Sequence, residues 1–437
     1  MTTDLPNPTP PLPDGPNLPA WRVAQAWMER PVEFWEECGA RWGETFTLEL
    51  GSIGTTVLFS HPDAIRDMFK LPASSYECRP FNLVYKKIMG EHSALMADGD
   101  DHRRIRRILG PPVQPRAFGP HIDRVGPIVR ETVSVWPTDR PFSPRPELHL
   151  LSLKIILTML VGPSDEDFTR GLIEFFRDEI FRHLLTTTPW TRFVQQQPRL
   201  REHISREIAR KRSALEPTGP SLFDALIRAR DDSGEPLADS EIGDHLCTML
   251  IAGVEPTALA LAWGLYWVHE NPDVLARLRR ELDPIGIAPT ATQLLENRYL
   301  NAVCAETLRM YPIGPTPTGR KLVAETEIGG RRYPAGVTLV ACTHLVHRRP
   351  DIYPEPGQFR PERFLDRQFA PHEFFPSGGG LRTCLGASLA PLEMNLALAA
   401  ILATWSLTPA HDGPVRPVRH ATLIAPSEHL KFRATDR

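Results

Sequence analysis

The longest run of apolar positions in the chain extends from Asp239 to Glu270, and it predicts one long helix. Asp239 or Ser240 provides a polar side chain that can cap its start, and Asn271-Pro272 ends it. At about 1.5 Å per residue the helix would be roughly 45 Å long. We therefore expect it to cross the whole molecule.

The remaining pattern predicts further helices and a small amount of strand. Helical spacing is clearest over residues 23–42, 168–185 and 199–215. Alternating apolar residues predict strands at 45–50, 55–59 and 337–341, the first two joined as a hairpin by four residues with glycine at each end. Residues 73–98 show no clear period. The expected fold class is mainly α with small β-sheets.

Composition predicts one large domain. The chain has 437 residues, and its 45 prolines are scattered, so they mark many turns rather than one disordered tract. Residues 1–20 are proline-rich and polar, and we expect a flexible lead-in there, whereas no linker divides residues 21–437, which we expect to form a single catalytic domain. The lead-in has no apolar run suited to a signal peptide or a membrane anchor, so no membrane association is expected.

Charge and cysteine usage exclude two further classes. The net charge of −3 argues against a protein that binds nucleic acid. The six cysteines are widely spaced and include no C-x-x-C pair. This usage predicts a reduced, cytoplasmic protein rather than a disulfide framework.

The candidate chemistry is concentrated in residues 374–387, which read Phe-Phe-Pro-Ser-Gly-Gly-Gly-Leu-Arg-Thr-Cys-Leu-Gly-Ala. Three glycines allow a tight turn and a close approach to a flat ligand. Cys384 precedes a helical pattern, where amide N–H groups and the helix dipole favour the thiolate that a soft metal binds. A P-loop would need a Gly-Lys pair, and a cysteine phosphatase would need arginine where Ala390 stands. The loop alone fits a metal ligand and an ordinary buried cysteine equally well.

This loop resembles the haem-binding segment of the cytochrome P450 family, whose pattern is Phe-x-x-Gly-x-Arg-x-Cys-x-Gly. Gly380, Arg382, Cys384 and Gly386 match that pattern. The resemblance implies a haem b cofactor with Cys384 as its axial ligand, and cofactor-binding roles for Arg382 and Gly386. Ser377 departs from the pattern, because the family has phenylalanine there. A serine could expose the sulfur or give it a hydroxyl hydrogen bond, and either would tune the iron potential.

A basic segment matches a second motif of the family. His102 and Arg106 are four residues apart, so on a helix they share a face that suits a carboxylate partner. Such a run is usually a solvated surface, but the family places a similar His-x-x-x-Arg against the haem propionates, and it also implies Arg320 there. The other arginines of the segment are expected to be surface charges facing an acidic electron donor, namely Arg103, Arg104 and Arg107.

The middle of the long helix carries a third motif, Ala252-Gly253-Val254-Glu255-Pro256-Thr257. Pro256 stands where the family has a threonine whose hydroxyl helps deliver protons. Proline has no N–H and predicts a kink that frees the Ala252 carbonyl and opens room beside the iron. We expect Glu255 to relay protons instead, with the Thr257 hydroxyl one residue beyond Pro256. Fatty-acid peroxygenases of the family also have proline here, but after an arginine, so neither version of the motif is complete.

Glu306 and Arg309 form the fourth motif. They are three residues apart on a predicted helix, which on its own is a weak signal. The family has a buried Glu-x-x-Arg at this point, paired with a later arginine that corresponds to Arg363 here. We assign these three residues to structural support of the haem site.

The four motifs occur in the order of the family, over roughly residues 20 to 435. The resemblance implies a monomeric haem-thiolate oxidoreductase. It would oxidise an apolar small molecule, such as a terpenoid, a fatty acyl compound or another secondary metabolite, with O₂ and electrons from a separate ferredoxin or flavodoxin. Two alternatives stay open: peroxide-driven or rearrangement chemistry because of Pro256, and a haem-based binding or sensor protein without turnover.

The substrate pocket has only weak candidates in the sequence. The resemblance suggests Val254, Thr316, Thr318 and Leu423. It also suggests a mobile lid over residues 186–198, which include Trp190 and Phe193, although ordinary packing explains these two aromatic residues equally well.

Overall fold

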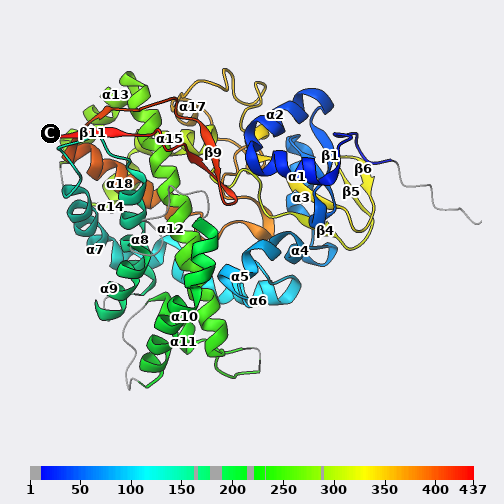
Figure 1. Ribbon diagram of the computed structural model, residues 1–437, viewed down its shortest axis with the longest axis horizontal. Coiled ribbons are helices and arrows are strands. Elements are labelled where there is room, and N and C mark those ends of the chain that lie inside the picture. Colours follow the sequence, from blue (N-terminus) through cyan, green and yellow to red (C-terminus); the bar gives the residue numbers. More distant parts are fainter. Residues whose placement is uncertain (1–10, 162–165, 178–188, 214–220, 232, 287–289) are drawn as a thin grey trace, which may run out of the picture.

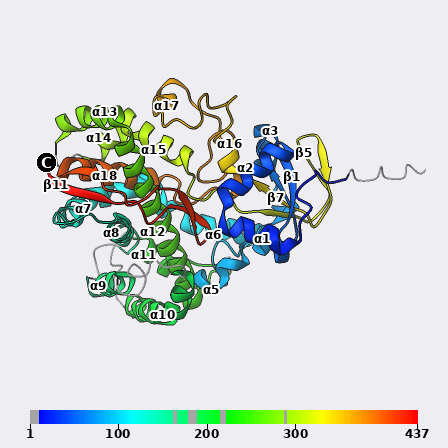
Figure 2. The same ribbon diagram turned by 45° about the horizontal axis from the view of Figure 1, so that its top comes forward.

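The computed structural model describes residues 11–161, 166–177, 189–213, 221–231, 233–286 and 290–437. Helices dominate one side of the molecule and the largest sheet lies on the other (Figure 1). The view in Figure 2 shows the same division, with α1, α2 and β1 on the sheet side and α7, α8 and α18 on the helical side. The expected class, mainly α with small sheets, is confirmed.

The α-helices that precede α7 in the chain, together with α16 and α17, are at most 12 residues long. They are α1 (Ala20–Glu29), α2 (Pro31–Trp42), α3 (Pro62–Lys70), α4 (Arg79–Asn82), α5 (Lys86–Met89), α6 (Gly99–Leu109), α16 (Thr343–Val346) and α17 (Arg363–Asp366). The remaining α-helices are α7 (Pro115–Ser134), α8 (Arg145–Leu160), α9 (Glu166–Phe175), α10 (Pro189–Ser213), α11 (Leu222–Arg228), α12 (Asp239–Glu270), α13 (Pro272–Leu282), α14 (Ala291–Glu296), α15 (Arg298–Met310) and α18 (Leu389–Thr404).

Helix α12 has the bounds that the sequence predicts. It packs against α8, α18, α15 and the strand β10 (Leu423–Pro426). Within the described residues it is the one helix long and apolar enough to cross a membrane, but most of it is buried inside the fold. The predicted cap is wrong, because Ala238 is the N-cap residue and the Asp239 carboxylate accepts a hydrogen bond from Arg212 Nε at 2.7 Å instead.

Two other helix predictions need correction. The helical spacing over 23–42 belongs to two helices, because the chain turns at Arg30 and Pro31 begins α2. The helix predicted over 168–185 ends at Phe175, followed by a short π-helical turn at 176–177, and residues 178–188 lie outside the described residues. Helix α10 covers 189–213, so the predicted lid falls partly on its first turns and partly outside the described residues, as do the side chains of Trp190 and Phe193.

The main sheet has the strand order β1-β2-β7-β4-β3. The predicted hairpin is confirmed as β1 (Thr45–Glu49) paired antiparallel with β2 (Thr55–Phe59), with Phe46 opposite Leu58. The predicted third strand is β7 (Thr338–Ala341), which runs parallel to β2. The other two strands are β4 (Arg320–Leu322) and β3 (Tyr76–Glu77). Strand β3 lies in the stretch that shows no sequence period.

Three two-stranded sheets complete the fold. Their strands are β5 (Thr326–Ile328) with β6 (Arg331–Tyr333), β8 (Trp405–Pro409) with β11 (Phe432–Asp436), and β9 (Pro417–His420) with β10. The β9–β10 hairpin is held against the helical core because Trp263 Nε1 of α12 donates to the Ile424 carbonyl at 3.2 Å. This contact brings the hairpin, which lies near the end of the chain, to the C-terminal half of the long helix.

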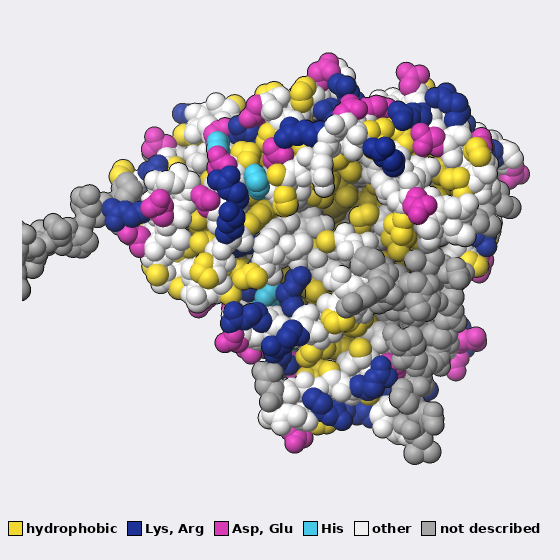
Figure 3. Space-filling model, turned by 180° about the vertical axis from the view of Figure 1, so that it is seen from behind, with side chains coloured by type: hydrophobic (Ala, Val, Ile, Leu, Met, Phe, Trp, Pro, Cys, Tyr) yellow, Lys and Arg dark blue, Asp and Glu magenta, His cyan; other side chains and the backbone are white. Residues whose placement is uncertain are grey.

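Residues 11–19 lie along the edge of the main sheet. The Thr47 amide of β1 donates to the Asp14 carbonyl at 3.1 Å. The surface carries mixed charges, and on the face seen in Figure 3 apolar side chains gather near the middle, with Lys and Arg on both sides of them.

Candidate active site

The cysteine loop is a tight turn that two glycines make possible. Gly378 and Gly380 have φ angles of 70° and 67°, in the left-handed region that favours glycine. A Cβ on Gly380 would also lie 2.2 Å from the Phe69 carbonyl oxygen. The Cys384 amide donates to the Ser377 carbonyl at 2.9 Å, which closes the turn. Ser377 therefore supports the loop through its backbone.

Cys384 faces an interior space. Its side chain is exposed, and yet burial within the protein raises the pKa of its thiol. Both observations hold only for a sulfur that borders an open space inside the fold. The other five cysteines are buried.

The predicted helix start after Cys384 is wrong. Helix α18 begins at Leu389, five residues later, so the cysteine lies outside the first turn where the helix dipole acts. Burial raises the pKa of the thiol, and the Gly386 amide and Arg106 lower it only in part. The thiolate that the sequence predicts would thus need a bound metal ion to stabilise it.

Three predicted arginines converge on this loop from different elements. Arg106 Nη1 of α6 donates to the Thr383 carbonyl at 2.6 Å. Arg320 Nη2 of β4 donates to the Gly379 carbonyl at 3.0 Å, while its Nε and Nη1 are buried without a hydrogen-bond partner among the described residues. Arg382 lies in the short 3-10 helix η8 (Gly380–Arg382) within the loop itself.

Asp98 is a site residue that the sequence analysis missed. Its carboxylate accepts hydrogen bonds from the Cys78 and Arg79 amides, at 2.8 and 3.1 Å, and forms an ion pair with Arg382. It precedes α6 as its N-cap residue and so fixes Arg382 relative to His102 and Arg106. An acidic residue just before the His-x-x-x-Arg helix was the available signal.

His102 is buried within the same cluster. Burial, Arg382 and Arg106 together lower the pKa of its imidazole to about 3, so the ring is neutral near pH 7. It can then donate one hydrogen bond to an anion without adding a further positive charge.

The cluster holds more positive charge than its protein partners neutralise. Arg106, Arg320 and Arg382 carry three charges, and burial lowers the pKa of Arg106 and of Arg320. Among the residues that the structure describes, Asp98 is the one carboxylate that contacts them, which leaves a surplus of two positive charges there beside the Cys384 sulfur. A flat metal cofactor with two carboxylates, as in haem, fits this donor set and this charge.

The middle of α12 borders open space as well. Ala252 is exposed although most residues further along the helix are buried. Glu255 is three residues on, so it shares the same helix face, and its side chain is 18% exposed. The helix continues through Pro256 to Glu270.

Two histidines that the sequence analysis missed contact Glu255. Its Oε1 atom lies 3.0 Å from His149 Nε2 of α8 and 2.9 Å from His420 Nε2 of β9. They lower the pKa of Glu255 well below its usual range, although burial acts in the opposite direction. The signal for His149 was a histidine inside an otherwise apolar helix, and His420 gave none.

Thr257 lies on a different part of the α12 surface. It is buried, and its hydroxyl interacts with Glu393 of α18, which also accepts a hydrogen bond from Ser152 Oγ at 3.1 Å. Burial raises the pKa of Glu393 to about 8, so this carboxyl group is protonated at neutral pH. The structure thus places Thr257 in a contact with α18 and not beside Glu255.

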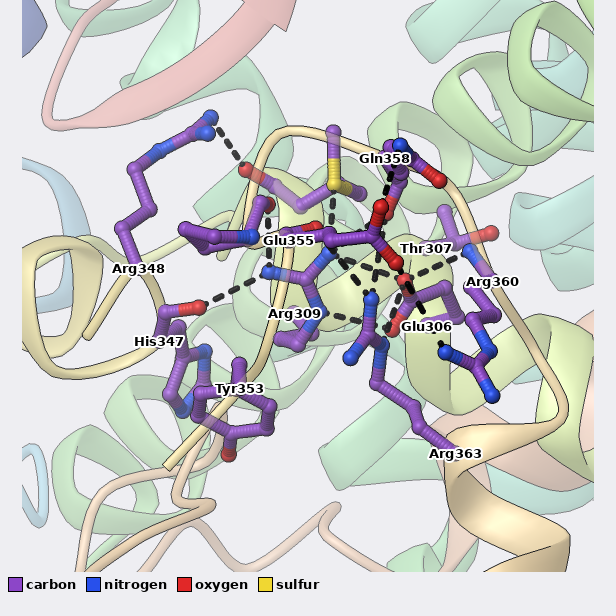
Figure 4. Close-up of polar contacts among 12 residues, drawn as sticks. Glu306, Thr307, Arg309, His347, Arg348, Tyr353, Glu355, Gln358, Arg360 and Arg363 are labelled. Atoms are coloured by element: carbon purple, nitrogen blue, oxygen red, sulfur yellow. Dashed lines mark hydrogen bonds and ion pairs between the residues drawn. The ribbon is translucent and has the colours of Figure 1, made fainter. Parts of the chain in front are cut away.

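Glu306, Arg309 and Arg363 come together in the interior (Figure 4). Both Glu306 oxygens accept from Arg309, from Nε at 2.6 Å and from Nη2 at 2.8 Å, and Arg363 Nε donates to Oε1 at 3.0 Å. Arg309 Nη1 also donates to the His347 and Pro356 carbonyls, at 2.8 and 3.0 Å. The cluster therefore ties α15 to the segment that leads into the cysteine loop.

The weaker pocket candidates differ in how deeply they are buried. Val254 is buried in the helical core, whereas Thr316, Thr318 and Leu423 are half-buried. A Cβ on Gly386 would lie 3.8 Å from Cys384 Sγ, which is an ordinary contact distance. Gly386 is therefore close to the sulfur, but a Cβ at this position would not clash with it.

Comparisons with known proteins agree with this arrangement. The family model "Cytochrome P450" matches residues 10–433. Cytochrome P450 135B1 of Mycobacterium tuberculosis is 30% identical, over 97% of this chain and 91% of its own length. Cyclooctat-9-en-7-ol 5-monooxygenase of Streptomyces melanosporofaciens is 28% identical, over 90% of this chain and 88% of its own.

A solved structure shows the same fold. The retinoic acid-bound cyanobacterial CYP120A1 superposes with a TM-score of 0.84 over 98% of this chain and 100% of that one, at 24% identity. The family match over nearly the whole chain and the 30% identical relative show that the chain belongs to the cytochrome P450 family, as a haem-dependent oxidoreductase of the monooxygenase type.

Proposed function

We propose that this protein inserts oxygen from O₂ into an apolar small molecule, with electrons from a separate ferredoxin or flavodoxin. The observation that carries the proposal is Cys384, which faces an interior space beside two uncompensated positive charges. Haem b fits both features, through its iron and its two propionates. When bound by a thiolate it supplies the O–O cleavage chemistry of this family.

The residues of the chain have distinct roles in this proposal. Cys384 ligates the iron, and His102, Arg106, Arg320 and Arg382 bind the propionates. Asp98 fixes Arg382, Gly378 and Gly380 shape the loop, and Gly386 lies close to the Cys384 sulfur. Glu255 holds a carboxylate at the open face of α12, where it can pass protons.

The substrate class rests on a related enzyme and on the packing of this chain. The Streptomyces relative is named for oxygenation of cyclooctat-9-en-7-ol. We propose a similarly apolar metabolite here, such as a terpenoid or a fatty acyl compound, contacted by Thr316, Thr318 and Leu423. Electrons would arrive at the basic surface that includes Arg103 and Arg107, both exposed on α6.

Titration of the ferric Soret band of the purified holoprotein tests this proposal. A panel of terpenoids, fatty acids and their derivatives is expected to contain one class that shifts the iron towards high spin, because a bound apolar molecule displaces water from the pocket. The shifting compound should then be oxidised when NADH, a ferredoxin reductase and a ferredoxin are supplied. Binding without any oxidation would contradict the proposal and favour a binding or sensor protein.

Pro256 favours a second candidate function, oxidation driven by peroxide, because the usual hydroxyl is absent. Pro256→Thr is expected to lower the fraction of electrons lost as hydrogen peroxide severalfold, since the threonine hydroxyl restores a proton donor. Peroxide release per NADH consumed, with the shifting compound bound, measures this fraction.

Pro256→Ala is the matched control, because it restores the backbone N–H without the hydroxyl. Equal coupling in all three proteins would show that this position relays no protons. Rapid product formation with hydrogen peroxide alone would establish the second candidate instead.

A further inference from the structure

Three ionisable side chains from distant parts of the chain meet beside Pro256. They are His149 of α8, Glu255 of α12 and His420 of β9, with both histidine Nε2 atoms within 3.0 Å of Glu255 Oε1. By distance both contacts are ion pairs. The His149 ring is fully buried.

The protonation of His149 follows from its other nitrogen. His149 Nδ1 lies 2.6 Å from the Arg145 carbonyl oxygen, a group that only accepts, so Nδ1 carries a hydrogen. In a neutral ring Nε2 would then be a lone pair facing a carboxylate oxygen at 3.0 Å, which is repulsive. The contact is favourable only when one additional proton lies between His149 and Glu255.

His420 has the opposite arrangement. Its Nδ1 lies 3.4 Å from Arg145 Nη2, and a guanidinium only donates, so Nδ1 accepts. The hydrogen of a neutral His420 is therefore on Nε2, directed to Glu255. His420 can hold the carboxylate in place without supplying a proton of its own.

The surroundings of Glu255 contain few other charges. The charged groups that act on Glu255 are His149 and His420. Burial lowers the pKa of the nearby Arg145, and the Glu255 carboxylate offsets part of this effect. The next buried acid, Glu393, interacts instead with Ser152 and Thr257. In this interior, an unshared lone pair or an unneutralised carboxylate would be costly.

We propose that His149 and Glu255 share one proton and that His420 positions the carboxylate, so that the three residues form a proton store at the centre of α12. The use of this store rests on the proposed function. The proton moves from His149 Nε2 to Glu255, which leaves a neutral imidazole and a carboxyl group. Glu255 then gives it to water or substrate on its open face, and a new proton from water on that face returns to His149 through Glu255. This arrangement supplies the proton without a hydroxyl at position 256.

His269 provides a matched internal control. His269 lies in α12, the helix that carries Glu255, and it is buried. Its Nδ1 faces the carbonyl of the residue four positions earlier, Leu265, at 2.8 Å, just as His149 Nδ1 faces the Arg145 carbonyl. Its Nε2 has no carboxylate or other hydrogen-bond partner among the described residues. Burial lowers its pKa to about 4, so His269 should be neutral at pH 7.

The test is a side-chain ¹⁵N–¹H correlation spectrum of the holoprotein in its ferrous carbon-monoxide form, which is diamagnetic. Among the 15 histidines, the signals of His149, His269 and His420 are identified by the loss of one signal set in His149→Gln, His269→Gln or His420→Gln. At pH 7 we expect both His149 nitrogens to be protonated, His269 to carry hydrogen on Nδ1 alone and His420 on Nε2 alone. In Glu255→Gln, His149 should lose its Nε2 hydrogen.

A neutral His149 in the wild-type protein would overturn the proposal, whether or not the enzyme turns over. The use of the store is read separately, as peroxide release per NADH consumed with the shifting compound bound. His149→Gln should raise this release severalfold, most strongly at high pH, and His269→Gln should not. If the spectrum shows the shared proton but His149→Gln does not raise peroxide release, the catalytic role is overturned. An inactive wild-type protein would contradict the proposed function, and the spectrum alone would then show whether His149 and Glu255 share a proton.

Discussion

Cys384→Ser is expected to abolish the thiolate-type carbon-monoxide spectrum and all oxidation, while the protein stays folded. A serine hydroxyl remains protonated at any working pH and is a harder ligand than sulfur, so it cannot give the iron the electron push of a thiolate. The loop itself should persist, because its closing bond runs between the Cys384 amide and the Ser377 carbonyl. The ferrous carbon-monoxide difference spectrum and the haem content measure the effect.

Cys304→Ser is the control for this substitution. Cys304 Sγ donates to Asn395 Oδ1 at 3.1 Å in the core, and a serine hydroxyl can make the same bond. This variant should keep the wild-type spectrum. A Cys384→Ser protein that retains the thiolate-type spectrum would show that another residue ligates the iron.

Arg309→Ala is expected to destabilise the protein by about 3–5 kcal/mol, because it leaves the buried Glu306 carboxylate without its main partner. It also removes the hydrogen bonds to the His347 and Pro356 carbonyls. The free energy of unfolding in urea, measured on samples of equal haem content, gives the value.

Arg66→Ala is the matched control. Arg66 Nη1 lies 2.6 Å from Asp63 Oδ1, the same sequence spacing and the same distance as in the Glu306–Arg309 pair. The side chains of Arg66 and Asp63 are 42% and 56% exposed, whereas those of Glu306 and Arg309 are fully buried. We expect a loss below about 1 kcal/mol for this exposed pair. Equal losses in the two variants would show that the buried cluster does not support the fold.

The sequence predicted elements best where local signals agree. Helix α12 has the expected bounds because an uninterrupted apolar run ends at Asn271-Pro272. The β1–β2 hairpin formed as expected because alternation and two glycines specify the same turn. The cap of α12 was wrong because Asp239 had a stronger partner, Arg212, which is distant in the sequence.

The sequence predicted those site residues that lie in short continuous motifs. His102, Arg106 and Cys384 lie in recognisable local patterns, and the fold brings them together. Asp98, His149 and His420 act through contacts with residues far away in the chain. The local signals of Asp98 and His149 do not identify those partners, and His420 has no local signal. The pKa of Cys384 depends on burial, which only the folded chain determines.

Because the other five cysteines are buried, labelling of Cys384 can report the fraction of molecules that hold the cofactor. In the folded protein Cys384 alone has an exposed thiol, and burial raises the pKa of the others, to about 11 for Cys78 and about 12 for Cys247. A bound haem would cover the Cys384 sulfur and occupy its reactive electron pair. The number of thiols that a maleimide labels per native molecule should therefore equal the fraction of molecules without cofactor, which can be counted by mass spectrometry without any optical signal.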